Sequence, residues 1–396
     1  MVQVVTSPVS SSSRCSAAAA GVVVRPVRSR RDLGAFLRLP WRVYENDPQW
    51  VPPLLAERKQ FVDPRRHPFY LHGTAEKFLA LRAGEPVGRV LVSDDPRYNA
   101  EHGTNLGAFG LFECLDDHAV AAALLDAAAD WLIQRGRTAI WGPLDYSTNY
   151  PCGLLVEGFD TPPRVMMNHN PPYYERLLEG WGLERVKDLF SWWFEDEFNM
   201  LDRWRARAER LAKRGQIRIR PFRVDRPAAD IELCKRVYHA AWQKNWGFVP
   251  MTDAEFGYLA KGLLHLAIPE MLLLAEIDGQ VVGFSMTLPD LNEAIRPLNG
   301  RLFSWGLPLG WWRFHRNRRR IKTARMAALG VLEPYRRRGV LELLILHSLE
   351  YGKHVLRYTG AELGWTLEDN ETVNQVIAAV GGRLYKRYRL YQRPIG

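Results

Sequence analysis

The residues best suited to chemistry lie in the stretch 326–346, which reads MAALGVLEPYRRRGVLELLIL. An apolar run ends at Glu333-Pro334, the basic turn Arg336-Arg337-Arg338-Gly339 follows, and a second apolar run begins at helical spacing. This order predicts a strand, a glycine-containing loop and the start of a helix. A helix N-terminus presents free N–H groups and the positive end of the helix dipole, so the junction is suited to bind phosphate. A solvated basic turn is the alternative.

The elements that must position this junction occur twice in the chain. The hairpin predicted at 78–90 has glycines at positions 84 and 88, and the hairpin at 272–284 has them at 279 and 283. Five elements follow the same order and approximate spacing in both halves, which indicates duplication of a whole domain rather than a solenoid. The other paired elements are helices 119–134 and 341–356, strands 138–142 and 361–366, helices 173–179 and 374–380, and strands 186–194 and 382–391.

The motif Arg336-Arg337-Arg338-Gly339-Val340-Leu341 resembles the signature of the GNAT acyltransferase superfamily, Gln/Arg-x-x-Gly-x-Gly/Ala after a strand. It matches at the arginine and the first glycine, and it departs where Leu341 replaces glycine or alanine. The resemblance implies an α/β fold with a mixed sheet, built as two tandem GNAT domains. It also implies that backbone amides of the loop hold the pyrophosphate of an acyl-CoA donor, with no metal.

The two halves are not equivalent. Where the second half has the basic loop, the first has Phe112-Glu-Cys-Leu-Asp-Asp117, which is acidic and lacks glycine and would therefore repel a pyrophosphate. We expect a disordered leader over residues 1–24, a degenerate GNAT-like domain over 25–200 and a catalytic GNAT domain over 201–396. One active site per chain is the prediction.

The resemblance also implies where the donor binds. GNAT enzymes use a backbone N–H at the end of the strand before the loop to stabilise the developing oxyanion, and here that position falls near Gly330 to Leu332. The start of the last helix contributes as well. The predicted cofactor-binding residues are Gly330, Val331, Leu332, Arg336, Arg337, Arg338, Gly339, Val340, Leu341 and Asn370.

Transfer to an amine further needs a base for the ammonium proton and an acid for the leaving thiolate. The usual GNAT acid is a tyrosine on the last helix, and Ile377 stands at its position. Tyr385 or a water then serves as the acid, or the thiolate leaves unassisted. Glu362 and Glu368 are the predicted bases. Capping of the last helix by Glu368-Asp369-Asn370 is the alternative, since Asp and Asn are preferred N-caps.

Two further regions are candidates for the acceptor site. The stretch 241–250 falls where GNAT domains place the helices that line this site, and it supplies Asn245 and Trp246. The polar and aromatic loop 144–153 of the first half supplies Asn149 and Tyr150. Loops of this composition often bind ligands, although turn formation and a core role for the tryptophans are equally open.

Composition limits the function classes. A chain of 396 residues with 14 Trp and 47% hydrophobic residues can fill two cores. A net charge of +10 indicates an anionic partner. Four separated cysteines without a Cys-x-x-Cys pair predict neither a zinc site nor a disulfide framework, and no apolar run reaches the roughly 18–20 residues of a spanning helix. We expect a cytoplasmic protein.

Residues 296–325 form a basic, tryptophan-rich insert in the second half. No acidic residue occurs between Glu293 and Glu333, and the segment 302–314 reads LFSWGLPLGWWRF. An apolar, aromatic stretch beside a basic cluster is typical of an interfacial membrane segment, which predicts peripheral binding to an anionic inner-membrane surface through 302–325. A lid and an RNA-binding patch are the alternatives, and nucleic acid is not expected. The basic residues are Arg296, Arg301, Arg313, Arg316, Arg318, Arg319, Arg320, Lys322 and Arg325.

The stretches Pro40-Trp-Arg-Val-Tyr44 and Trp246-Gly-Phe-Val-Pro250 resemble a bacterial family of tandem-GNAT proteins associated with bacterial ceramide synthases. That resemblance implies N-acylation of a long-chain sphingoid base by acyl-CoA. Acetylation of a small polar amine and a Fem-type transfer from aminoacyl-tRNA are alternative activities. A non-catalytic pair that binds acyl-CoA or membrane is a further alternative, favoured by Leu341 and Ile377.

Overall fold

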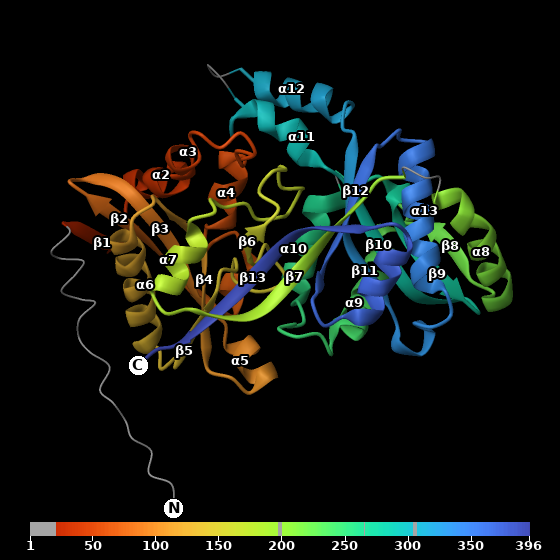
Figure 1. Ribbon diagram of the computed structural model, residues 1–396, viewed down its shortest axis with the longest axis horizontal. Helices are drawn as coiled ribbons and strands as arrows, with labels where there is room; N and C mark the ends of the chain where they lie inside the picture. The colour runs from red at the N-terminus through yellow and green to blue at the C-terminus, as the bar shows by residue number, and fades with distance from the viewer. Residues whose placement is uncertain (1–20, 197–199, 265, 304–306) are drawn as a thin grey trace, which may run out of the picture.

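A computed structural model describes residues 21–196, 200–264, 266–303 and 307–396. Thirteen strands form one continuous mixed sheet in these residues, and helices cover both of its faces (Figure 1). The predicted α/β class with a mixed sheet is confirmed. Most of the predicted leader lies outside the described residues, and the first strand, β1 (Val22–Pro26), begins within its last three positions.

The first half of the chain contains the elements that the repeat predicted, with additional short helices between β1 and the first hairpin. After β1 these are α2 (Arg30–Arg38), α3 (Pro40–Val43), α4 (Leu55–Phe61), η1 (Pro68–Leu71), β2 (Thr74–Arg82), β3 (Glu85–Asp94), α5 (Pro96–His102), β4 (Leu106–Cys114), α6 (His118–Ile133), β5 (Ala139–Gly142), β6 (Leu154–Glu157), α7 (Tyr174–Gly180) and β7 (Glu184–Phe194).

The second half repeats this order and carries the insert between its second hairpin strand and the following strand. Its elements are α8 (Met200–Gly215), β8 (Arg218–Pro221), α9 (Pro227–Trp242), α10 (Asp253–Leu264), η2 (Pro269–Met271), β9 (Leu272–Ile277), β10 (Gln280–Pro289), α11 (Leu291–Ile295), η3 (Arg296–Leu298), α12 (Leu309–Arg318), β11 (Thr323–Val331), η4 (Glu333–Tyr335), α13 (Val340–His354), β12 (Gly360–Leu367), α14 (Glu371–Ala379) and β13 (Arg383–Pro394).

The stretch 112–117 is only partly the acidic loop that was predicted. Its first three residues end β4, and Glu113 is held by Tyr174, whose hydroxyl donates to it at 2.8 Å. Asp117 is the N-cap of α6, since its side chain accepts the N–H groups of Ala119 and Val120 at 3.0 and 3.2 Å. A carboxylate that occupies the helix N-terminus fills the place of an anion. The first half therefore presents no open phosphate site at this junction.

The two halves exchange their last strands. The order across the sheet is β1-β2-β3-β4-β5-β13-β7-β12-β11-β10-β9-β8, so β13 from the end of the chain lies between β5 and β7. Tyr391 of β13 pairs with Gly142 of β5, and Trp192 of β7 pairs with Leu363 of β12. Each half completes the sheet of the other. The domain boundary predicted at residue 200 stays a prediction. Strand pairing joins the residues before it to those after it in one sheet.

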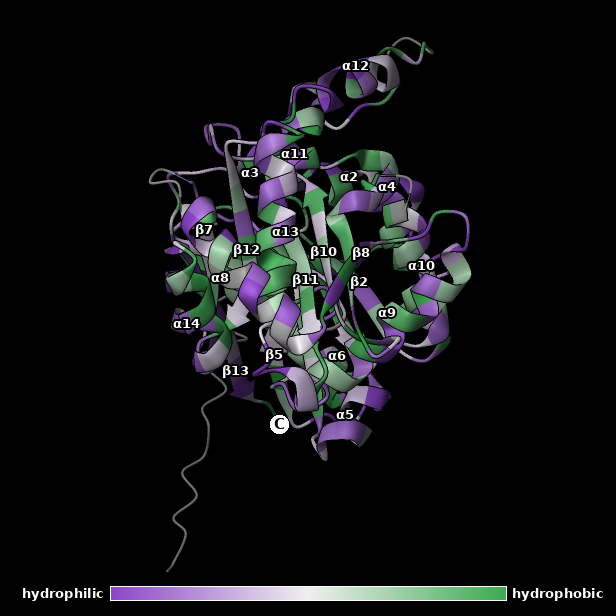
Figure 2. Ribbon diagram, turned by 90° about the vertical axis from the view of Figure 1, so that its right-hand side faces the viewer, coloured by the Kyte–Doolittle hydropathy of each residue, from purple (hydrophilic) through white to green (hydrophobic). Residues whose placement is uncertain are grey.

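Apolar helix faces bury the sheet. Helix α6 packs on the first half, and α13 and α9 pack on the second half in separate hydrophobic clusters. Leu344 and Ile345 of α13 are fully buried, and each such side chain stabilises the fold by about 1.5–3 kcal/mol. Figure 2 shows hydrophobic strand residues enclosed between helices whose outer sides are hydrophilic. This packing fixes β11 and α13, the strand and helix of the predicted donor site.

Candidate functional site

Strands β11 and β12 run side by side and then separate. Their parallel pairing extends from Thr323 with Gly360 to Met326 with Leu363, while β11 continues to Val331 and β12 to Leu367. The opening belongs to a cavity of about 960 Å³, lined by residues 327–331 on one side and 364–367 on the other. This volume lies at the upper end of the range for small-molecule sites, about 300–1,000 Å³.

The edge of β11 that faces the opening has free backbone groups. The N–H of Leu332 donates to the carbonyl of Val282 at 2.8 Å, which fixes the alternation of the antiparallel pair. Gly330 and Leu332 therefore direct their backbone groups to β10, while Leu329 and Val331 direct theirs to the opening. Of the three predicted oxyanion donors, Gly330 and Leu332 direct their N–H groups to β10, and only the N–H of Val331 faces the opening. Leu329 offers a second N–H there, which the sequence did not indicate.

Gly330 is needed for close packing rather than for a hydrogen bond. A Cβ at this position would lie 2.3 Å from Cζ3 of Trp242, which sits on α9 and lines the cavity. Any larger residue would displace this indole from the surface of β11. From the sequence, a core role and a site role were both possible for the tryptophans of 241–250. In the structure, Trp242 forms part of the cavity wall.

The basic loop ends at an uncapped helix. Gly339 is the N-cap of α13 with φ 88° and ψ 8°, a left-handed conformation that favours glycine, and no side chain accepts the first N–H groups of the helix. The N–H groups of Val340 and Leu341 belong to this first turn. An uncapped N-terminus beside arginines is the arrangement expected of an anion site, and it fits the pyrophosphate of CoA.

The three arginines of the loop have different surroundings. Arg336 donates from Nε to the carbonyl of Val331 at 3.3 Å and from Nη2 to that of Ala241 at 2.9 Å, so it ties the loop to β11 and α9. The guanidinium of Arg338 lies 5.1 Å from the ring centre of Tyr335. Arg337 is exposed and lines the cavity, which makes it the best placed of the three to meet a phosphate.

The last helix borders the cavity on the other side of the opening. Ile377 and Leu341 are buried in the core of the second half and line the cavity, so the position of the usual GNAT tyrosine offers no hydroxyl. Asn370 is the N-cap residue of α14, but its side chain makes no capping bond and borders the cavity. Asp369 pairs with Lys187 at 2.8 Å. Side-chain capping by these two residues, the alternative raised by the sequence, is absent.

The predicted acid and bases lie outside the cavity. Glu362 is fully buried, accepts from Nε of Arg325 at 2.8 Å and from the hydroxyl of Tyr385, and has its pKa raised by burial against the opposing effect of Arg325. Burial also raises the pKa of Tyr385. Glu368 accepts from Arg185 and from the N–H of Asp188. None of the three candidates lines the cavity, whereas Arg325 does.

The predicted acceptor residues do come together. Asn149, Tyr150, Asn245 and Trp246 all line the cavity, although about a hundred residues separate the two pairs. Nδ2 of Asn149 donates to the carbonyl of Val249 at 2.9 Å, and the Tyr150 hydroxyl donates to Glu255 at 3.3 Å. The loop of the first half is thus bonded to the segment after α9, and both halves build one wall.

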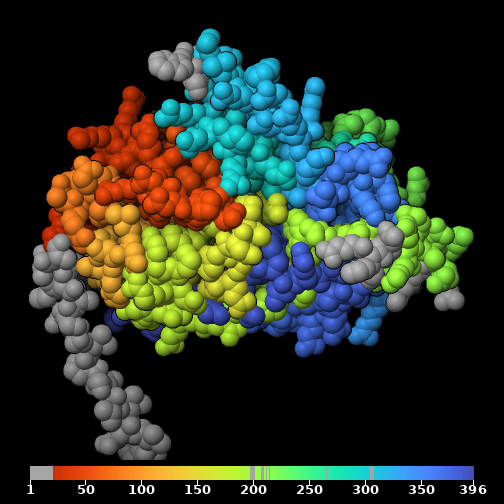
Figure 3. Space-filling model, turned by 45° about the horizontal axis from the view of Figure 1, so that its top comes forward, coloured from red at the N-terminus to blue at the C-terminus, as the bar shows by residue number. Residues whose placement is uncertain are grey.

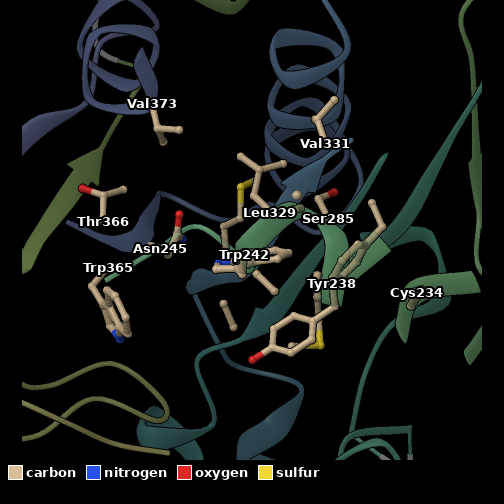
Figure 4. Close-up of a pocket in the computed structure, with 18 of the residues that line it drawn as sticks. Cys234, Tyr238, Trp242, Asn245, Ser285, Leu329, Val331, Trp365, Thr366 and Val373 are labelled. Carbon is tan, nitrogen blue, oxygen red and sulfur yellow. The ribbon is translucent and has the colours of Figure 1, made fainter. Parts of the chain in front are cut away.

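Other residues of the site carried no usable sequence signal. The Tyr238 hydroxyl donates to Oδ1 of Asn149 at 2.5 Å, and burial raises the pKa of this tyrosine. Figure 4 shows Trp365 and Thr366 on one side of the cavity and Tyr238 on the other, with Trp242 between them. An aromatic residue within an apolar helix or strand has the same pattern whether it fills a core or borders a cavity.

The charge of the lining is concentrated near the loop. Its two carboxylates, Glu333 and Asp369, are exposed and paired with Lys244 and Lys187. The remaining charged residues of the lining are cationic. Apart from Arg325, which is buried and paired with Glu362, the deeper surfaces are uncharged. An amine that enters them is favoured in its neutral, nucleophilic form because burial disfavours the ammonium. Within the described residues no His, Cys, Asp and Glu side chains cluster in a way that could hold a metal ion.

Comparisons with known proteins identify relatives in sequence and in fold. No protein-family model matches the chain. It is 35% identical over 384 residues to a bacterial ceramide synthase from Caulobacter vibrioides, with 95% of this chain and 98% of that protein covered. It is 34% identical over 377 residues to Protein YghO from Escherichia coli, with 94% and 95% covered. A tandem GNAT protein from the clavulanic acid biosynthesis pathway shares the fold, with a TM-score of 0.56, 14% identity, and 95% and 99% of the two chains covered.

Proposed function

Because the chain belongs to the family of the bacterial ceramide synthase and Protein YghO and is a GNAT-type N-acyltransferase, we propose that it transfers a fatty acyl group from acyl-CoA to the amine of a long-chain sphingoid base. The relative's name supports this acceptor, since a ceramide is an N-acylated sphingoid base. The observation that carries the proposal is the cavity itself, which joins an uncapped helix N-terminus to the free edge of β11 and to an uncharged interior.

The donor is assigned to the opening between β11 and β12. The pyrophosphate of acyl-CoA binds the first N–H groups of α13 and Arg337, and Gly339 gives the loop its left-handed turn. The remaining donor contacts come from the N–H groups of Leu329 and Val331 and from the carbonyl of Leu329, since Arg336 already bonds the carbonyl of Val331. One of these N–H groups stabilises the oxyanion that forms on the thioester carbonyl during attack. Asn370 borders the same opening and is retained as a donor contact.

The chemical step is assigned to desolvation and backbone hydrogen bonds. The neutral amine attacks the thioester carbonyl, the C–N bond forms, the C–S bond breaks, and the CoA thiolate leaves without a protein acid. The amine proton passes to water. Glu362, Glu368 and Tyr385 do not touch the cavity, so we assign them no direct contact with the reacting atoms.

Mass spectrometry tests the proposed activity. Purified protein incubated with palmitoyl-CoA and sphinganine is expected to form the N-palmitoyl product and release CoA, and a small polar amine is expected to give far less product at equal concentration. Acetyl-CoA serves as the donor control. Acetyl transfer to the polar amine without palmitoyl transfer to sphinganine would refute the lipid acceptor. Absence of CoA release with every combination of donor and amine would refute the enzymatic proposal as a whole.

We also propose that the insert rests on an anionic membrane surface, from which a lipid acceptor would be drawn. Phe303, Leu307, Trp311 and Trp312 are 55–64% exposed. The insert to which they belong, drawn in cyan, projects from the molecule beside the first-half helices (Figure 3). Exposed arginines surround these side chains, which supports an interfacial segment. No helix among the described residues combines the length and apolar character that spanning a bilayer requires.

Two of the predicted basic residues are not part of this surface. Arg325 is buried against Glu362, and Arg318 is half-buried and donates to the carbonyl of Leu266 at 2.9 Å. Arg325 stays paired with Glu362 because an unpaired buried charge would be costly. Arg318 is fixed by its hydrogen bond to the segment after α10. The seven predicted basic residues that remain are exposed: Arg296, Arg301, Arg313, Arg316, Arg319, Arg320 and Lys322.

Liposome co-sedimentation tests this surface. The double substitution Arg319→Ser and Arg320→Ser is expected to weaken binding to anionic liposomes about tenfold or more, since each arginine near the surface contributes about 1 kcal/mol. Arg30→Ser with Arg31→Ser is the matched control, because both arginines are exposed and lie on α2. Equal binding by the two variants would contradict the assignment. It would also be contradicted if a higher salt concentration did not weaken binding of the unmodified protein, since salt screens electrostatic attraction.

A further inference from the structure

The cavity extends past the opening of the sheet into an apolar space under α9 and α10, which we call the α10 chamber. Its outer wall is Phe256, Leu259, Ala260 and Leu263 of α10. Its inner wall comes from α9 and from β9 and β10, where Phe284 and Met286 face it, and every lining side chain from these four elements is uncharged. An uncharged, apolar lining of this kind does not suit a phosphate.

Helix α10 packs on the first-half core through Leu259, and much of its apolar face borders the cavity. Of its described side chains only Glu255 is buried, whereas Phe256, Leu259 and Ala260 line the cavity and are half-buried. The helix is instead anchored at its start, where Glu255 accepts the N–H and hydroxyl of Thr252 at 3.0 and 2.9 Å. An apolar helix face that borders a large cavity leaves hydrophobic area in contact with water, and a hydrocarbon chain in the cavity would remove it.

The neck of the chamber is polar. The Tyr238 hydroxyl and the Asn149 amide are bonded to each other, and both residues line the cavity, as does Asn245. Polar groups at the neck of an apolar space suit an amphiphile whose head carries hydrogen-bonding groups. A fatty acyl chain has no such groups beyond its carbonyl, whereas an amine with hydroxyl groups on a hydrocarbon chain has them. The neck therefore favours the acceptor over the donor as the occupant.

We propose that the α10 chamber holds the hydrocarbon chain of the amine acceptor and that Ala260 sets the longest chain that fits. This inference rests on the proposed function, because it names the place of one of the two reactants. Ala260 is the smallest side chain of the outer wall, so a larger residue there shortens the space without removing a polar contact. Asn149, Asn245 and Tyr238 bind the amine and hydroxyl groups at the neck.

The variant Ala260→Trp tests the proposal with amino diols of octyl to octadecyl chain length. For the unmodified protein, kcat/KM is expected to rise about fourfold for each methylene that the chamber buries. In Ala260→Trp the rise should stop at a shorter chain, with a loss of about tenfold or more for the octadecyl amine and little change for the octyl amine. Ala260→Leu should give a chain-length limit between those of the unmodified protein and Ala260→Trp. This smaller substitution keeps the proposal testable if Ala260→Trp fails to fold.

Lys261→Trp is the matched control, because Lys261 is the next residue of α10, is exposed and does not line the cavity. It is expected to keep the chain-length profile of the unmodified protein. The same variants are then assayed with acyl-CoA of varied chain length. If Ala260→Trp changed the preferred acyl chain instead of the preferred amine chain, the chamber would hold the donor and the assignment to the acceptor would be wrong. If neither chain-length profile changed, the chamber would hold neither chain.

A binding measurement separates this inference from the proposed reaction. Titration of the protein with the octadecyl amino diol, without any acyl donor, is expected to show affinity that Ala260→Trp lowers about tenfold and Lys261→Trp does not. That result would support the chamber even if no acyl transfer were found. Equal affinity of both variants would refute the chamber even if transfer to sphinganine were found.

Discussion

Replacing Gly339 with valine is expected to raise the KM for acyl-CoA about 10- to 100-fold. Gly339 has φ 88° at the N-cap of α13, a conformation that a β-branched residue adopts only at a cost of about 1–3 kcal/mol. The chain relieves that strain by turning the loop, which redirects the N–H groups of Val340 and Leu341 away from the pyrophosphate. Each 1.4 kcal/mol lost in binding is a factor of ten.

Gly84→Val is the matched control for this variant. Gly84 has φ 83° in the turn between β2 and β3, where a Cβ meets nothing within 4 Å, so the backbone strain is similar and the donor site is remote. Both variants are compared by steady-state kinetics and by thermal unfolding. Gly84→Val should lower the melting temperature and leave KM unchanged. A Gly339→Val protein whose KM for acyl-CoA equals that of Gly84→Val would show that the donor does not bind this loop.

Replacing Glu362 with alanine is expected to lower the free energy of unfolding by about 3–5 kcal/mol. Glu362 is fully buried, and its partner Arg325 is 4% exposed with the two side chains 2.8 Å apart. Loss of the carboxylate leaves the guanidinium charge buried without a counter-charge and removes the acceptor of the Tyr385 hydroxyl. Breaking one side of a buried ion pair has a cost of this size. Urea unfolding at neutral pH measures it.

An exposed ion pair provides the control. Glu350→Ala breaks the pair between Glu350 and Nε of Arg205, which lie 2.6 Å apart at the surface, and should change stability by less than about 1 kcal/mol. The double variant Arg325→Met with Glu362→Leu should recover most of the loss, because no unpaired charge remains. A Glu362→Gln protein with unchanged stability and a kcat reduced a hundredfold or more would instead assign Glu362 to the chemical step.

The fold followed from the sequence wherever local patterns decide structure. The two glycine hairpins, helix α13, strand β12 and the last helix and strand occur at or within a few residues of their predicted positions. Hydrophobic periodicity and turn residues are local properties, and the duplication supplied each element with an independent second copy. The stretch 112–117 was assigned to a loop because it corresponds to the basic loop of the second half, whereas Glu113 lies in β4 and Asp117 caps α6.

The site followed only in part. The sequence indicated the loop from Arg336 to Leu341 and the four acceptor residues that line the cavity. It also selected Glu362, Glu368 and Tyr385 for their chemical types, and these lie outside the cavity in ion pairs and a buried hydrogen bond. The sequence around a carboxylate is the same whether an arginine or a substrate faces it in space. The role of the carboxylate depends on that neighbour, which is distant along the chain.

By itself the sequence determined the junction from Met326 to Leu346: a strand, a basic glycine-containing loop and the start of a helix, since each depends on neighbours within a few residues. Only the tertiary structure decided what that junction faces. The exchange of β7 and β13, the divergence of β11 from β12 and the chamber under α10 all arise from contacts between residues far apart in the chain. An apolar residue carries no mark that tells whether its neighbour in space is a side chain or a cavity, and packing alone makes that distinction.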